Sequence, residues 1–146
     1  YEVEEHHEKR SLSANSYYWT LCSKLAAVLH EKQPVIHNRM IREYGQREIM
    51  DGKVVNVLIP DTEEAERTAL EANTYHIRPT SQVIKGLRNY VLMRGSSTYD
   101  SKEMSVLLDG LVQECKDAGV ETLTPDQLEE LRGYEKQTYK GLRDKT

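Results

Sequence analysis

Residues 99–119 read YDSKEMSVLLDGLVQECKDAG and carry a complete set of helix signals. Asp100 is a favourable N-cap, and Glu103 follows three residues later, which is the spacing of a capping box. Gly119 supplies a C-terminal stop. Between these ends the apolar residues recur every three or four positions, as they do on one face of a helix: Met104, Leu107, Leu108, Leu111, Val112, Cys115 and Ala118. The segment therefore predicts an amphipathic helix with one buried face.

A second set of the same signals follows on the C-terminal side. In TPDQLEEL, Thr124 is the N-cap, Pro125 takes the first helical position, and Gln127 closes another capping box. The sequence is polar from Tyr134 onward. We therefore expect a single α+β domain over residues 1–133 and a polar tail over residues 134–146. The chain begins with Tyr1 rather than Met, so we also expect that a native N-terminal segment precedes it.

Strand signals dominate the middle of the chain. NYVLMRG, residues 89–95, predicts a strand, TYHIRP at 74–79 is a weaker candidate, and SQVIKG at 81–86 fits a strand or a loop. Asp51-Gly52 suits a type I′ turn, so REIMDGKVVNVLIP, residues 47–60, predicts a hairpin that ends at Pro60.

Helical signals surround these strands. The sequence predicts a helix of about 17 residues from Ser11 or Ser13, a second from Pro34 to about Tyr44, and a short acidic helix from Asp61 or Thr62 to about Glu71. YEVEEHHE, residues 1–8, predicts a short strand. The fold class is α+β, with four to five helices packed on a small, largely antiparallel sheet.

Charge is distributed unevenly along the 146 residues. The net charge of −4 argues against a uniformly basic nucleic-acid binder, and the sequence has no run of about 18 apolar residues, so we expect no membrane partner. Residues 61–71 hold five acids and one Arg, a local −4, whereas residues 72–99 hold four cations and no acid, a local +4. Residues 32–42 add three cations without an acid. Basic segments are thus separated from acidic ones.

Motifs for catalysis are weak. Adjacent His6 and His7 would face opposite sides of a strand, and His30, His37 and His76 have no metal-binding spacing, so surface or partly buried histidines are favoured. We predict no catalytic residue, no metal site and no cofactor, and the balance is against an enzyme. A Mg²⁺-dependent nuclease or junction resolvase is an alternative. It requires carboxylates from distant segments to meet, such as Asp51, Asp61 and Asp109.

The two cysteines and one Ser-rich turn have simple structural interpretations. Cys22 and Cys115 lie on apolar helical faces, which favours core thiols in a reduced cytoplasm over a disulfide or redox pair. RGSSTYDS, residues 94–101, could hold a phosphate with its backbone N–H groups. The helix cap at Asp100 uses the same groups and explains the stretch better.

Residues 9–19, KRSLSANSYYW, contain the pattern basic-Ser-Leu-x-x-Asn-x-x-x-Trp. This pattern resembles the start of the phage NinB family, also called Orf recombination proteins. Residues 90–131 are similar to the C-terminal half of related uncharacterised proteins of phages and prophages of Gram-positive bacteria. The two blocks cover less than half of the chain. The resemblance implies a homodimer that binds single-stranded DNA without catalysis, and that helps to load a recombinase beside single-strand-binding protein in the host cytoplasm.

Candidate DNA contacts follow from this resemblance and from the basic segments. The motif itself matches at Arg10, Ser11, Asn15 and Trp19. Three consecutive aromatic residues cannot all lie on one helical stripe, so at least one must meet solvent, another element or a ligand. The expected DNA-binding residues are Lys9, Arg10, Arg39, Arg42, Arg78, Lys85, Arg88 and Arg94 for phosphates, Tyr17 or Trp19 for base stacking, and Asn15.

A third alternative is a protein-interaction module of a phage replication or recombination complex. Its docking or dimer face would come from the two capped C-terminal helices together with Tyr134 and Tyr139.

Overall fold

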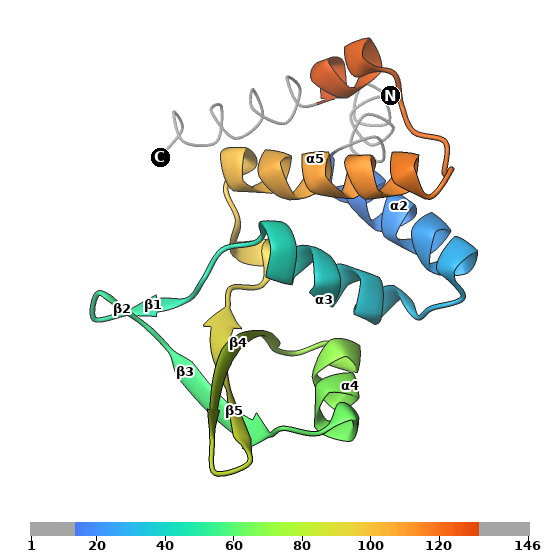
Figure 1. The fold of residues 1–146 in the computed structure, drawn as a ribbon. Helices are drawn as coiled ribbons and strands as arrows, with labels where there is room; N and C mark the ends of the chain where they lie inside the picture. The colour runs from blue at the N-terminus through green and yellow to red at the C-terminus, as the bar shows by residue number, and fades with distance from the viewer. Residues whose placement is uncertain (1–13, 132–146) are drawn as a thin grey trace.

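The computed structural model describes residues 14–131. Three helices, α2 (Ala14–Leu29), α3 (Gln33–Tyr44) and α5 (Ser101–Asp117), pack against one another in the upper part of Figure 1. Their apolar faces meet in the main hydrophobic core, whose fully buried members include Tyr18, Leu21, Ile36, Leu108 and Leu111.

The sheet lies below this helical layer (Figure 1). It has three antiparallel strands in the order β3 (Asn56–Pro60), β5 (Leu87–Met93) and β4 (His76–Ile84). Helix α4 (Glu63–Glu71) lies against one face, where Ala69, Ile77 and Tyr90 form a second, smaller core. Two further elements connect these parts: a short separate hairpin of β1 (Ile49–Met50) and β2 (Lys53–Val54), and the 3-10 turn η1 (Ser96–Thr98).

Helix α3 ties the two parts together through its polar side chains. Asn38 Nδ2 donates to the backbone oxygens of Leu70 at 2.7 Å, in the last turn of α4, and of Ala72 at 2.9 Å, its C-cap. Arg42 Nε donates to the oxygen of Ile77 in β4 at 2.9 Å. These bonds fix both α4 and the sheet to the helical layer.

The predicted α+β class is confirmed. At α5, Asp100 accepts from Glu103 N at 2.8 Å while the Glu103 carboxylate accepts from Asp100 N, so the capping box is complete. Residues 125–131 are helical, and Thr124 and Gln127 make the reciprocal bonds of the second box. Cys22 and Cys115 are free and buried, as core thiols are. None of the helices within residues 14–131 is long and apolar enough to cross a membrane.

The expected hairpin over residues 47–60 is only partly present. Asp51 and Gly52 do form its turn, both with positive φ, but the hairpin strands are two residues long. The chain then leaves the hairpin, and β3 pairs with β5 instead. The reason is packing: in this pairing, Val57 and Ile59 of β3 pack against the small core under α4. The predicted strand over residues 1–8 and the tail over residues 134–146 lie outside the described residues.

Candidate nucleic-acid interface

Three of the cations expected to contact phosphates are held by carboxylates. Arg42 forms a bidentate pair with Glu66 at 2.6 and 2.8 Å, and only 13% of its side chain is exposed. Arg88 pairs with Asp61 at 2.8 Å, and Arg94 pairs with Glu103 at 3.1 Å. Both arginines are more exposed than Arg42, and each also donates to a backbone oxygen. These guanidinium groups stabilise the fold and would have to exchange partners to bind DNA.

The remaining candidates are placed differently. Arg39 is exposed on α3 and lies 3.7 Å from Glu31, whose carboxylate is chiefly bound by Arg67. Asn15 is exposed in the first turn of α2. Lys9 and Arg10 precede the described residues.

The aromatic residues of the opening motif pack against other elements. Tyr18 is fully buried in the core, and the Tyr17 hydroxyl accepts a hydrogen bond from Leu123 N at 2.7 Å, beyond α5. The Trp19 ring lies 4.4 Å from the His37 ring in α3 and 5.3 Å from the Tyr18 ring. The motif therefore anchors α2 both to α3 and to the segment beyond α5. Of the alternatives for the aromatic residues, contact with another element is the one that the structure shows.

His37 was expected at the surface or partly buried, but it is 6% exposed. Its Nδ1 lies 2.7 Å from the Tyr18 hydroxyl, and its ring meets that of His76 edge to face at 5.1 Å. His76 Nδ1 in turn lies 2.6 Å from Asn38 Oδ1. Burial, with a smaller contribution from His76, lowers the pKa of His37 to about 3, and burial also lowers that of His76. Both rings are neutral at neutral pH.

These histidines predict a loss of stability on mild acidification. The unfolded chain takes up their protons below about pH 6.5, whereas the folded chain takes them up only at lower pH, so unfolding is favoured as pH falls. From pH 6 to pH 5, His37 alone should lower the free energy of unfolding by about 1 kcal/mol. Urea unfolding at several pH values would measure this slope. His37→Gln should make it shallower by the contribution of His37, and an unchanged slope would contradict the assignment.

The sheet face opposite α4 carries cations without carboxylate partners. Cross-strand neighbours point to the same face, so the register places a set of side chains together on that side. We call this set the open face: Asn56, Leu58, Arg78, Ile84, Leu87 and Asn89. Leu58 and Ile84 are 49% and 43% exposed. In Figure 1, α4 lies on the other side of the strands. Within residues 14–131, no helix covers the open face at the end of the sheet where β4 turns into β5.

Arg78 lies at the end of the open face nearest the helical layer, in one row with Asn56 and with Val91, which is buried in the main core. Its guanidinium donates to the Arg42 oxygen at 3.3 Å and makes no ion pair with the described residues. Lys85 occupies the β4–β5 turn with φ of 50° and is likewise without an ion pair in residues 14–131. Lys53 and Arg47, which the sequence did not single out, are exposed cations in and next to the β1–β2 hairpin.

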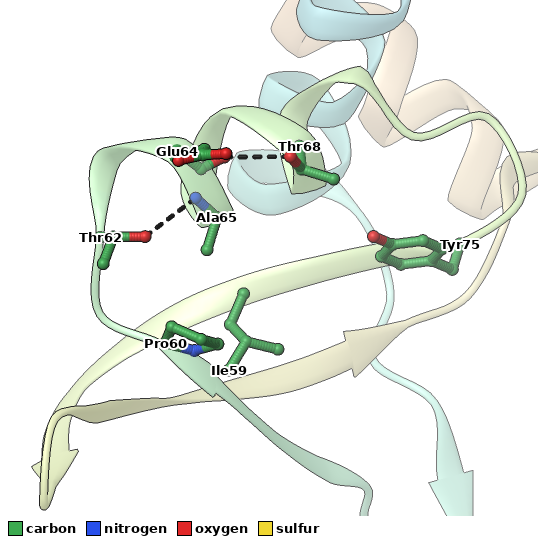
Figure 2. A pocket seen from close by; sticks show the side chains of 7 residues that line it. All are labelled: Ile59, Pro60, Thr62, Glu64, Ala65, Thr68 and Tyr75. Atoms are coloured by element: carbon green, nitrogen blue, oxygen red, sulfur yellow. Dashed lines mark hydrogen bonds between the residues drawn. The ribbon is translucent and has the colours of Figure 1, made fainter.

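A groove between α4 and β3 is the main alternative to this face. It encloses about 390 Å³ and is lined by Ile59, Pro60, Thr62, Glu64, Ala65, Thr68 and Tyr75 (Figure 2). The Thr62 hydroxyl accepts from Ala65 N at 3.1 Å, and the Thr68 hydroxyl donates to the Glu64 oxygen at 3.0 Å. Both hydroxyls therefore serve α4 itself. The remaining polar groups of the groove are the Glu64 carboxylate and the Tyr75 hydroxyl, and a carboxylate does not favour a phosphate.

The three carboxylates considered for a metal-dependent nuclease lie in different parts of the described structure. Within residues 14–131, no group of three or more His, Cys, Asp or Glu side chains is placed to hold a metal ion. Asp51 lies in the hairpin turn, Asp61 pairs with Arg88, and Asp109 lies on the exposed face of α5. The described residues thus give no support to the nuclease alternative.

No family model matches this chain, and neither the curated proteins nor the solved structures include a significant match.

Proposed function

We propose that this protein is a phage-type recombination accessory protein, and that it binds single-stranded DNA on the open face without catalysing a reaction. The observation that carries the proposal is the contrast among the arginines. Arg42, Arg88 and Arg94 are neutralised by carboxylates, whereas Arg78 makes no ion pair with the described residues and donates only to the Arg42 backbone oxygen. Cations left unpaired are the groups that displace counterions from phosphates.

The surroundings of Arg78 support the same interpretation. Lys85 ends the open face at one turn, and Lys53 lies on the hairpin beside β3. Leu58, Leu87 and Ile84 supply apolar surface between them, on which bases can rest. The described part of the open face has no aromatic ring, so binding should come mainly from phosphate contacts and depend little on base sequence. The resemblance of residues 9–19 and 90–131 to phage recombination proteins agrees with this proposal. A single-strand-binding protein or a recombinase as partner would agree with it as well.

Fluorescence anisotropy with a labelled single-stranded oligonucleotide tests the proposal. We expect Arg78→Ala combined with Lys85→Ala to weaken binding about tenfold at low salt. The slope of log affinity against log salt should become shallower by about 1.4, because two phosphate contacts to a single strand are lost. Intact DNA after incubation with Mg²⁺ is expected as well.

A matched variant separates this effect from a change in net charge. Lys24→Ala combined with Lys116→Ala removes two exposed cations from α2 and α5 and should bind nearly as the parent does. Equal losses in both double variants would mean that binding follows net charge rather than the open face. Parental binding by the Arg78/Lys85 variant would overturn the assignment.

A further inference from the structure

The groove between α4 and β3 has the chemistry of a site for a positively charged side chain. Ile59 and Pro60 of β3 and Ala65 of α4 give it apolar walls. Tyr75, 42% exposed, lies at one end, and Glu64 is the charged residue of the lining (Figure 2). The apolar stem of an arginine or lysine can rest against such walls while its charged head reaches a carboxylate.

The Glu64 carboxylate is available for this pairing. In the acidic segment around it, Asp61, Glu66 and Glu71 are each bound by an arginine. Glu63 and Glu64, in the first turn of α4, are exposed and make no ion pair with the described residues. Of these two, Glu64 lines the groove. The groove is therefore complementary to a cation.

Arginine fits the two recognition groups better than lysine does. Its planar guanidinium can donate two hydrogen bonds to a carboxylate, and it can also stack on the face of a tyrosine ring. Glu64 and Tyr75 lie at different points along the groove (Figure 2), so two arginine side chains of one segment can engage them. In an extended chain such arginines stand at alternate positions, because alternate residues point to the same side.

The outer edge of β3, next to the groove, can hold the backbone of an extended segment. Leu92 N donates to Val55 O at 2.8 Å, which fixes the phase of the ladder between β3 and β5. Alternate residues from Val55 onward therefore direct their backbone groups toward β5. Asn56 and Leu58 direct theirs away from the sheet, where the described residues provide no partner. The N–H and C=O groups of these two residues can pair with an added strand.

Strand addition brings the side chains of the segment to the groove. Residues of the added strand alternate between the two faces of the sheet. Those on the α4 side lie beside Ile59, which lines the groove, and those on the other side lie beside Leu58, which is 49% exposed. Addition of a strand to an open edge, with alternate side chains in neighbouring pockets, is a general mode of peptide recognition.

We propose that an extended segment of a different protein adds to the β3 edge and places alternate arginines in the groove, against Glu64 and Tyr75. Apolar residues between the arginines cover Leu58 on the other side of the sheet. The charge of the groove selects this partner, because an acidic segment or a phosphate would meet an unpaired carboxylate. The inference does not rest on the proposed binding of DNA.

Fluorescence anisotropy with a labelled peptide, Gly-Leu-Arg-Leu-Arg-Leu-Gly, and the full chain tests the proposal. A second peptide carries citrulline in place of both arginines, which keeps their shape and removes their charge. We expect the arginine peptide to bind more tightly. Glu64→Gln should weaken it about threefold and leave the citrulline peptide nearly unchanged. Glu63→Gln removes the same charge from the same turn of α4, outside the groove, and should have little effect.

Tyr75→Leu keeps an apolar side chain and removes the ring, so it should also weaken the arginine peptide about threefold. Its affinity for a single-stranded oligonucleotide should stay that of the parent. Equal binding of the two peptides would overturn the proposal, and so would equal losses in Glu63→Gln and Glu64→Gln. An effect of Tyr75→Leu on the oligonucleotide alone would assign the groove to nucleic acid. A peptide that acts only by dissociating a dimer in sedimentation would assign it to a second copy. Either result would contradict the proposal.

Discussion

Gly110→Val is expected to destabilise the protein by about 3 kcal/mol, because the site has no room for a side chain. Gly110 lies in the middle of α5, where its backbone faces the ring of Tyr44 from α3. A Cβ at this position would overlap several ring carbons of Tyr44. Tyr44 packs against the main core, and its hydroxyl donates to Glu114 Oε2 at 3.2 Å, so the ring is held in place.

The effect should appear as a fall in the midpoint of thermal unfolding of roughly 10 °C. Helix propensity cannot cause this loss, because valine is a better helix former than glycine. Gln113→Val, at an exposed position of the same helix, should cost only about 0.5 kcal/mol. Tyr44→Ala removes the ring, so the Gly110→Val change should cost much less in that background. Strict additivity of the two changes would show that the close approach is not the cause.

Arg42→Ala is expected to cost about 3 kcal/mol, since it leaves several partners unsatisfied at once. The guanidinium bonds both oxygens of Glu66 and the backbone oxygen of Ile77, while Tyr90 donates to Glu66 Oε1 at 2.9 Å. Arg42 also lowers the pKa of Glu66 through its hydrogen bonds. Its removal therefore loosens α3, α4 and β4 together.

Urea unfolding at pH 7 would measure this cost. Arg88→Ala, which breaks the more exposed pair with Asp61, should cost less than about 1 kcal/mol. Combining Arg42→Met with Glu66→Met should recover part of the loss, because the replacement side chains leave no buried charge unpaired. If Arg42→Ala is as stable as the parent, the pair is not structural, and Arg42 returns to the set of candidate DNA contacts.

Local signals predicted the helices well, because each was complete within a short segment. The capping boxes at Asp100 and Thr124 and the Pro at the start of α3 needed no distant contact to be recognised. The Lys85-Gly86 turn was harder to identify: both residues have positive φ, yet Lys is rarely found in that conformation. SQVIKG therefore appeared ambiguous, although it forms the end of β4 and its turn.

Long-range pairing could not be predicted in the same way. Whether β3 continues a hairpin or joins β5 depends on a small core made by α4, which no local pattern encodes. The candidate site was hard to predict for the same reason. The basic segments were visible in the sequence, but the carboxylates that neutralise Arg42, Arg88 and Arg94 lie in other segments and meet the arginines only in the fold. Sequence spacing likewise gave no sign that His37 and His76 meet.

Mapping the bound strand onto the protein tests the central claim most directly. The full chain, labelled with ¹⁵N, would be titrated with a short single-stranded oligonucleotide while its amide resonances are followed. We predict the largest changes in β3 and in residues 78–89, with α4 nearly unchanged. Changes confined to α2 and α4, with the amides of the open face unaffected, would contradict the account.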